Sequence, residues 1–311
     1  MPQGRWILIL SVCLIACAQG RDVPPERLQV HKQTTVIEAF RPNPEFDRHD
    51  PSNIIRYGGL YWVFYTYNVN NHEYVSIHAA SSVDGFSWTD LGEALGGGPS
   101  GAWDESGSIA PYVVPYENRF YLFYTGFNNG DLNTRQLGCA VANSPTGPWQ
   151  RAKSPVLQQS HDTEAWDSGM LGDSNVLYRE GKWWLYFKSR REKETARHTH
   201  VGVAVAHEIL GPYRKHVANP LFAGHAFSAW VHGQCVAALC GVVSPDILWS
   251  EDGIHFHKAG RMANTSTGFF CPGNFTDGTH AQGVRWGLER YSEHGARGLH
   301  RFDLSMQALK N

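Results

Sequence analysis

Two aspartates and a histidine are the residues whose types and neighbours best fit acid–base chemistry. Asp50 directly follows Arg48 and His49, and a nearby cation keeps a carboxylate ionised as a base. A carboxylate next to an imidazole favours its charged form, so Asp173 is expected to keep His225 protonated near neutral pH. A base that activates water and an acid that protonates the leaving oxygen are what cleavage of a glycosidic bond requires.

Each of these residues also has a purely structural interpretation. Asp50 could cap a strand or form an Asx-turn before Pro51. Asp173 could be a turn residue after Gly172, and His225 could be a buried histidine with satisfied hydrogen bonds. These alternatives remain open from the sequence alone.

Repetition of the surrounding segments favours the chemical interpretation. Comparable segments, polar at the start and then apolar, occur at 48–55, 106–114, 169–177, 224–230 and 278–283. Ionisable residues at the start of apolar strands are costly to bury without partners, so their repetition in register suggests a functional site. The same segments supply further candidate substrate-binding residues, namely Ser52, Asn53, Ser174, His280 and Gln282.

A repeated turn predicts the fold that would position these segments. Four Gly-containing turns that end in an aromatic residue occur at 82–88, 144–149, 207–213 and 250–256. Each comes after a β-rich run, and strands at 61–67, 119–126, 182–189 and 234–241 precede these runs. Such repeats predict an all-β, five-bladed β-propeller. The fifth blade is expected from 277–304, completed by a strand from 34–39, and a β-sandwich is the alternative.

The strand openings carry a resemblance to a known group of enzymes. Asp50-Pro-Ser-Asn-Ile-Ile55, Ala110-Pro-Tyr-Val113, Asp173-Ser-Asn-Val176 and the fifth-blade His280 resemble the motifs of five-bladed glycoside hydrolases, over residues 40–305. In family 43 the blade-one Asp is the general base, the blade-three Asp tunes pKa values and a blade-four Glu is the general acid. The fourth segment has His225 instead of a glutamate, which resembles family 117, the 3,6-anhydro-α-L-galactosidases.

The resemblance implies an inverting exo-glycosidase that removes terminal sugars from agar-type galactan oligosaccharides, with 3,6-anhydro-α-L-galactose as the expected sugar; the N-terminal pattern adds the expectation of export. Two other functions stay open. One is a family 43-like glycosidase acting on other plant or algal glycans, with Glu105 or Glu164 as the acid. The other is a non-catalytic propeller that binds glycans.

A repeated Ala-Trp-Asp motif lies shortly before two of the inner strands. Trp103, Glu105 and Trp166 belong to these motifs, and they are expected to stack on sugar rings and bind hydroxyls. A packing device between blades is the alternative. His280 could contact substrate, hold a structural Ca²⁺ or Mg²⁺ near the axis through water, or fill the channel. No cofactor is expected to be required.

The N-terminus resembles an export signal. Arg5 precedes a short apolar run that fits the h-region of a signal peptide. Residues 1–17 are therefore assigned to a signal peptide of lipoprotein type, 18–33 to a linker and 34–311 to the propeller. Cys17 is the candidate for lipidation, and Ala16-Cys-Ala18 is the competing cleavage site. The expected location is periplasmic, anchored to the outer membrane of a bacterium, or secreted.

Composition limits the partners. The formal net charge of −2 provides no basic field for nucleic acid or anionic lipid, so an oligosaccharide is the expected partner and a lipid anchor the one route to a membrane. The oligomeric state stays open. The run 188–197 mixes charges and predicts a solvated loop or the rim of a pocket for an anionic sugar. Cys235 and Cys240 flank one expected strand and should not pair.

Overall fold

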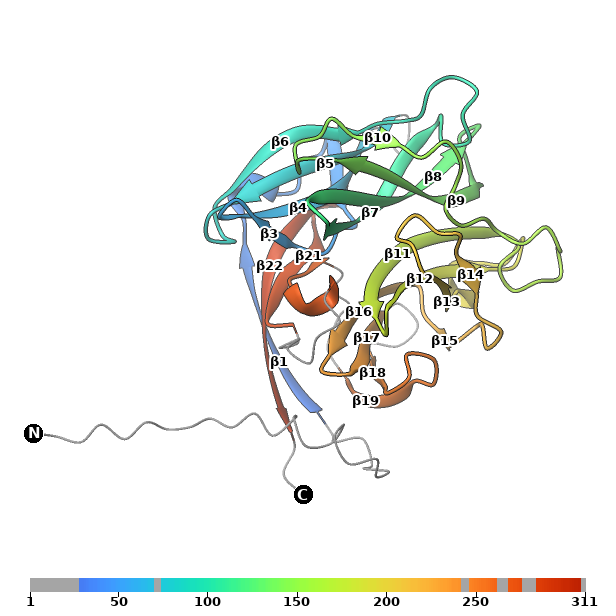
Figure 1. Ribbon diagram of the computed structural model, residues 1–311. Helices are drawn as coiled ribbons and strands as arrows, with labels where there is room; N and C mark the ends of the chain where they lie inside the picture. The colour runs from blue at the N-terminus through green and yellow to red at the C-terminus, as the bar shows by residue number, and fades with distance from the viewer. Residues whose placement is uncertain (1–27, 70–73, 242–245, 262–267, 276–283, 309–311) are drawn as a thin grey trace, which may run out of the picture.

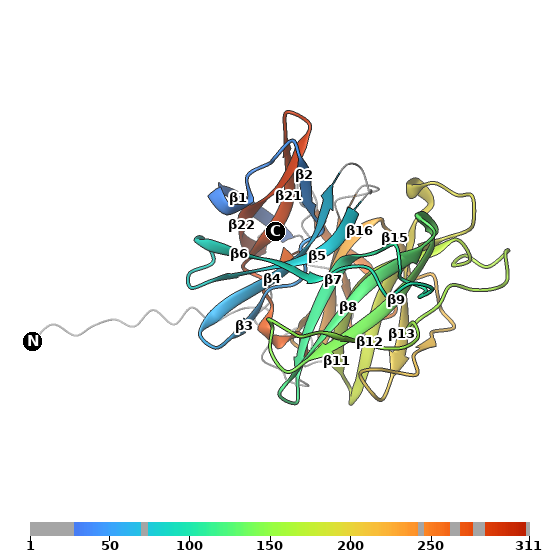
Figure 2. The same cartoon turned by 90° about the horizontal axis from the view of Figure 1, so that it is seen from above.

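The computed structural model describes residues 28–69, 74–241, 246–261, 268–275 and 284–308. These residues form five blades of antiparallel strands around a central axis, as seen in Figure 1 and, from above, in Figure 2. The all-β propeller predicted from the repeated turns is therefore confirmed. The signal peptide, Cys17, His280 and Gln282 lie outside the described residues.

The first three blades follow the predicted repeat. Blade one contains β2 (Phe46–His49), β4 (Leu60–Val69), β5 (Tyr74–Ser82) and β6 (Trp88–Leu95), with β3 (Ile55–Tyr57) paired to β4. Blade two contains β7 (Gly107–Tyr116), β8 (Arg119–Asn128), β9 (Asp131–Ala142) and β10 (Gln150–Arg151). Blade three contains β11 (Met170–Arg179), β12 (Lys182–Arg190), β13 (His200–Ala206) and β14 (Arg214–Lys215), with β15 (Phe222–Ala223) paired to β13.

The last two blades share one eight-stranded sheet. Blade four contains β16 (Ala226–His232), β17 (Cys235–Gly241), β18 (Asp246–Ser250) and β19 (His257–Arg261). Blade five contains β20 (Gly268–Phe269), β21 (Trp286–Glu293), β22 (Ala296–Ala308) and β1 (Leu28–Val36). Short 3-10 turns occur at η2 (Glu38–Phe40), η3 (Ala196–His198) and η4 (Pro272–Phe275).

The N-terminal strand closes the propeller. β1 pairs antiparallel with β22 along its whole length, from Leu28 opposite Ala308 to Val36 opposite His300, and Figure 1 shows the two strands side by side. An N-terminal strand in blade five was predicted, but at 34–39. Residues 28–33, which the sequence assigned to a linker, are part of β1. This outer strand is held by backbone pairing and is mostly exposed from residue 31 to 36, so it lacks the apolar alternation that reveals a strand.

Within the described residues, the innermost strand of blade five is the short β20. Residues 278–283, which were predicted to open this strand, lie outside the described part of the chain. Cys240 carries a free thiol, so the predicted absence of a bond between it and Cys235 is confirmed. No helix in the described residues is long and apolar enough to cross a membrane.

The repeated turns attach one blade to the next. In the first turn, Asp84 accepts hydrogen bonds from the backbone N–H groups of Phe86 and Ser87, both at 2.7 Å. Gly85 has φ +75°, and a Cβ there would come within 2.6 Å of Arg301. Gly253 has the same left-handed conformation and the same crowding against an arginine of the neighbouring blade. Glycine is therefore required at both turns for conformation and for space, which supports their structural interpretation.

Candidate active site

The same backbone distortion opens the inner strand of three blades. Asp50, Ala110 and Asp173 have φ values of 47°, 49° and 50°. The residues before them pair with the adjacent strand at equivalent points, His49 with Thr66, Ile109 with Thr125 and Gly172 with Lys188. In blades two and three the strand register shifts just after these pairs, as it does at a β-bulge. Bulges re-aim a side chain and are frequent next to active sites, and such strained backbone costs about 1–3 kcal/mol per residue.

Threonines of the preceding blade hold two of these bulges. The hydroxyl oxygen of Thr66 accepts the N–H of Ala110 at 2.9 Å, and that of Thr125 accepts the N–H of Asp173 at 3.3 Å. Lys188 occupies the equivalent position in blade three, and its ammonium group pairs with the Asp173 carboxylate instead. Blade one thus fixes the backbone of Ala110 in blade two, and blade two fixes the backbone of Asp173 in blade three.

Buried asparagines fix the distance between neighbouring inner strands. The side-chain amide of Asn53 donates to the Val113 carbonyl and its oxygen accepts the Val113 N–H, both at 2.8 Å. Asn175 accepts the N–H of Ala229 at 3.0 Å in the same way. Asn53 lies at the pocket where the sequence predicted it, but both ends of its amide are engaged by the protein backbone.

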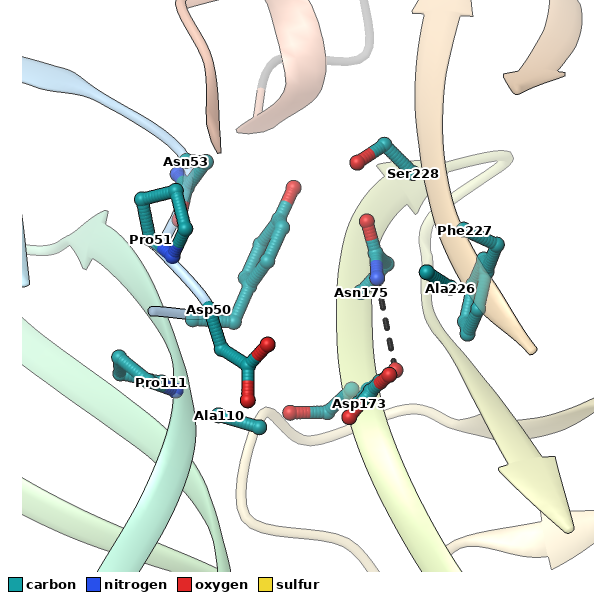
Figure 3. Close-up of a pocket in the computed structure, with 12 residues that line it drawn as sticks. Asp50, Pro51, Asn53, Ala110, Pro111, Asp173, Asn175, Ala226, Phe227 and Ser228 are labelled. Carbon is teal, nitrogen blue, oxygen red and sulfur yellow. Dashed lines mark hydrogen bonds between the residues drawn. The ribbon is translucent and has the colours of Figure 1, made fainter. Parts of the chain in front are cut away.

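The bulges bring their side chains to one pocket on the axis (Figure 3). It encloses about 380 Å³, including the part open to solvent, and three residues from each of blades one to four line it. The carboxylates of Asp50 and Asp173 come from different blades and both reach this space, as Figure 3 shows. The lining residues are Asp50, Pro51, Asn53, Ala110, Pro111, Tyr112, Asp173, Ser174, Asn175, Ala226, Phe227 and Ser228.

Asp50 is held as an anion. Burial works to raise its pKa, but the charge of His49 and a 2.9 Å hydrogen bond from His49 Nδ1, together with Lys188 and Arg290, outweigh burial and lower the pKa below the ordinary value. The side chain is 41% exposed, so water can reach the carboxylate. An ionised, solvent-accessible carboxylate is what a general base requires.

In contrast to that of Asp50, the pKa of Asp173 is raised above its ordinary value. Burial raises its pKa and the negative charge of Asp50 adds to this, while Lys188 and Arg135 oppose it. The side chain is 20% exposed and contacts the ammonium group of Lys188. Two carboxylates whose environments drive their pKa values apart are typical of an acid–base site.

The prediction for the charge of His225 is wrong. Burial, followed by the positive charges of Lys188, Arg190 and Arg135, lowers the pKa of His225 to about 3, and Asp50 only partly opposes this. The imidazole therefore sits among cations instead of beside an unpaired carboxylate, and the unliganded protein holds it neutral at pH 7. Its Nδ1 lies 3.1 Å from the hydroxyl oxygen of Thr199. His225 itself does not line the pocket, although the next residue, Ala226, does.

The two tryptophans predicted to bind sugar pack within their own blades. Trp103 stacks on Tyr124 with ring centres 5.9 Å apart, and Trp166 stacks on Phe187 at 5.6 Å. The aspartates that follow them are buried in ion pairs, Asp104 with Arg151 at 3.0 Å and Asp167 with Lys215. Neither tryptophan lines the axial pocket, so the geometry supports the packing interpretation of the repeated motif.

Other predicted residues divide between the pocket and the surface. Ser174 lines the pocket, whereas Ser52 is buried behind it, donating to the Asn53 carbonyl at 2.6 Å and accepting the N–H of Phe64. Glu105 and Glu164, the alternative acids, are both exposed and do not line it. Glu105 instead accepts the backbone N–H of Gly101 at 2.8 Å.

The cation site predicted near the axis involves His280, which lies outside the described residues. Within the described ranges, no group of three or more His, Cys, Asp or Glu side chains could hold a metal ion. The charges that surround Asp50 and Asp173 in this part of the chain are those of Lys188, Arg135 and Arg290.

Among the cations of the site, sequence reasoning missed Arg135, whereas Lys188 and Arg190 belong to the run 188–197 that was predicted to be a solvated loop or the rim of a pocket for an anionic sugar. One signal for Lys188 was present. The second strands of blades one and two read Phe-Tyr-Thr at 64–66 and 123–125, and blade three reads Tyr-Phe-Lys at 186–188. A lysine where the other copies have threonine marks a departure of the repeat at the functional end of the strand. Arg135 carries no comparable signal.

Comparisons with known proteins agree with this architecture. Residues 41–193 match glycosyl hydrolases family 43. A probable arabinan endo-1,5-α-L-arabinosidase B of Aspergillus fumigatus is 30% identical over 188 residues, which are 55% of this chain and 47% of that protein. The chain therefore matches about half the length of this curated relative.

Solved structures extend the similarity to the whole propeller. Zg3597, a family 117 glycoside hydrolase of the marine bacterium Zobellia galactanivorans, is 25% identical with a TM-score of 0.81, over 90% of this chain and 91% of that one. A GH43_1 enzyme of Xanthomonas citri complexed with xylotriose is 16% identical with a TM-score of 0.57, over 84% and 89% of the chains, which shows a common fold alone. The fold, the two aspartates in the axial pocket and the similarity to these proteins together define a five-bladed propeller of the glycoside hydrolase type. This is the class of protein that the motifs at the strand openings predicted.

Proposed function

We propose that the chain is an inverting exo-glycosidase in which Asp50 is the general base. The observation that carries this proposal is the ionised, partly exposed Asp50 carboxylate, which a left-handed backbone conformation places in the axial pocket that it shares with Asp173. Asp50 would take a proton from the water that attacks the anomeric carbon, and the leaving oxygen would receive a proton on the opposite face of the sugar.

Asp173 and His225 complete the proposed arrangement. Asp173, paired with Lys188, sets the electrostatic field of the pocket. His225 is the proposed proton donor, and it must gain a proton when substrate binds, because its pKa of about 3 leaves it neutral in the unliganded protein at pH 7. The terminal sugar of a galactan oligosaccharide, 3,6-anhydro-α-L-galactose in the first instance, is the proposed substrate. It is supported by the similarity to the family 117 structure. Export to the cell surface or the periplasm is proposed from the N-terminal pattern.

The lowered pKa of His225 also favours a second function, glycan binding without cleavage. An uncharged His225 and a blade-four strand without a carboxylate in the pocket fit a propeller that binds glycans without cleaving them. Catalysis separates the two functions.

The test is hydrolysis of a panel of agar, carrageenan, porphyran and arabinan oligosaccharides, with Asp50→Asn as the inactive control. Proton NMR of the product in the first minutes should show the anomeric configuration opposite to that of the substrate. Retention would remove Asp50 from the role of base. Binding without any hydrolysis would establish the glycan-binding alternative.

A further inference from the structure

Two guanidinium groups near the axial pocket have no carboxylate partner. Arg135 makes one side-chain hydrogen bond, from Nε to the Leu132 carbonyl at 2.5 Å, and within the described residues neither it nor Arg190 forms an ion pair. Asp131 attracts Arg135, and Glu194 attracts Arg190, but both act without direct contact. Lys188 differs from these two arginines, since it already pairs with Asp173.

The fold directs both arginines to the end of the strands where the carboxylates lie. Gln136, next to Arg135, pairs with Gly126, and the neighbouring Thr125 holds the backbone of Asp173. Arg190 ends β12 two residues after Lys188, opposite Met170 at the start of β11. Arg135 lies close enough to interact electrostatically with Asp173, Arg190 and Asp50. The two guanidinium groups do not line the axial pocket itself, but they belong to one charged cluster beside its two carboxylates.

We propose that Arg135 and Arg190 bind an anionic substituent of the substrate, a carboxylate or a sulfate ester carried by the sugar at the pocket or by its neighbour. This inference rests on the proposed glycosidase function and adds the class of sugar to it. Guanidinium groups bind both kinds of anion through two parallel hydrogen bonds. A neutral sugar offers no counter-charge to two neighbouring guanidinium groups.

The energetics of Arg135 support this assignment. Burial lowers the pKa of Arg135 to about 10, and the nearby Arg190 adds to this effect. A partly buried cation that lacks a direct partner is destabilised, and an anion bound against it removes that penalty. Asp50 and Asp173 supply part of the counter-charge at a distance, but Asp173 is neutralised by Lys188.

The same cluster links substrate charge to the proton donor. Arg190 and Arg135, with Lys188, lower the pKa of His225, while Asp50 raises it. An anion bound between the arginines cancels part of their charge and so raises the affinity of His225 for a proton. Proton binding and anion binding must then favour each other reciprocally. An anionic substrate would therefore make His225 easier to protonate than a neutral substrate does.

The experiment measures binding of three probes to the full chain by calorimetry, at constant ionic strength kept with sodium chloride. The probes are sodium sulfate, galacturonate and galactose, the last being the neutral match of galacturonate. We expect at least one anion to bind, and galacturonate to bind about tenfold more tightly than galactose if the site takes carboxylates. Sulfate binding without galacturonate binding would assign the site to sulfate esters.

Variants locate the binding. Arg135→Gln and Arg190→Gln should each weaken anion binding about tenfold, whereas Arg119→Gln, an exposed arginine at the far end of β8, should not change it. Arg135→Lys keeps the charge, so partial retention of binding in this variant covers the case in which the glutamine variant fails to fold. Failure of both anions to bind, or an equal loss in Arg119→Gln, would overturn the proposal.

Asp50→Asn separates this proposal from the proposed function. If Asp50→Asn and the native protein both bind the anion, but the native protein hydrolyses none of the oligosaccharides, the proposed glycosidase activity is disproved and the anion site is not. Equal kcat/KM on sulfated and enzymatically desulfated galactan oligosaccharides, with no anion binding, would disprove the anionic subsite alone.

Discussion

Replacement of Asp50 by asparagine is the most direct test of the chemistry inferred from the pocket. Asparagine tolerates the left-handed backbone at φ 47°, and its amide oxygen can still accept the hydrogen bond from His49 Nδ1. The fold should therefore survive. The lost function is proton abstraction from water, which contributes about 10²–10⁴-fold to kcat, or about 3–5 kcal/mol of activation free energy.

The assay is initial-rate hydrolysis of the best oligosaccharide from the panel, with the melting temperature measured in parallel. Asp47→Asn is the matched control, because Asp47 lies three residues earlier in β2 and pairs at 3.5 Å with Arg297 on the surface. Asp50→Asn should lose at least about a hundredfold in kcat, and Asp47→Asn should stay near the native rate. Turnover of Asp50→Asn within tenfold of native, or an equal loss in the control, would refute the role of Asp50.

A glycine at the same position gives an independent check. Glycine adopts the backbone conformation of Asp50 without strain and removes the carboxylate completely. Azide is an anionic nucleophile that needs no base, so it should restore turnover of Asp50→Gly and form a glycosyl azide of inverted configuration. A glycosyl azide of retained configuration would contradict this role, because the missing carboxylate would then lie on the side of the leaving group, as the acid–base residue of a retaining enzyme does.

Three further changes test the site and its support. Since the pKa of His225 is about 3 in the folded protein and about 6.5 when unfolded, the unfolded state binds the proton first as pH falls through this window. Native stability should drop there, and His225→Gln should lessen that drop in urea titrations at pH 7 and pH 4.5; an unchanged drop would contradict the lowered pKa. Asn53→Ala leaves the N–H and carbonyl of Val113 unpaired and should cost about 2–5 kcal/mol of unfolding free energy, against less than about 1 kcal/mol for the exposed Asn133→Ala. Trp103→Leu should lower the melting temperature and leave KM unchanged, whereas a raised KM at native stability would restore its role in sugar binding.

Local repetition explains why much of the architecture could be predicted. The glycine turns recur because each must bend sharply with a positive φ, and the glycines at 85 and 253 must also fit against a neighbouring blade. The openings at Asp50 and Asp173 could be found for the same reason, since both residues have the same left-handed backbone at equivalent positions of the repeat. The sequence by itself therefore determined the propeller and the pair of carboxylates at its axis.

Only the tertiary structure decided the protonation states of the ionisable residues in the site. The charge of His225 depends on Lys188 and Arg190 from blade three and Arg135 from blade two, residues that no local pattern relates to the histidine. The use of Trp103 as a packing residue depended likewise on the ring of Tyr124 beneath it. A sequence repeat reflects the structural requirements within each blade. A pKa depends instead on burial and on charged groups that several blades contribute to the same site.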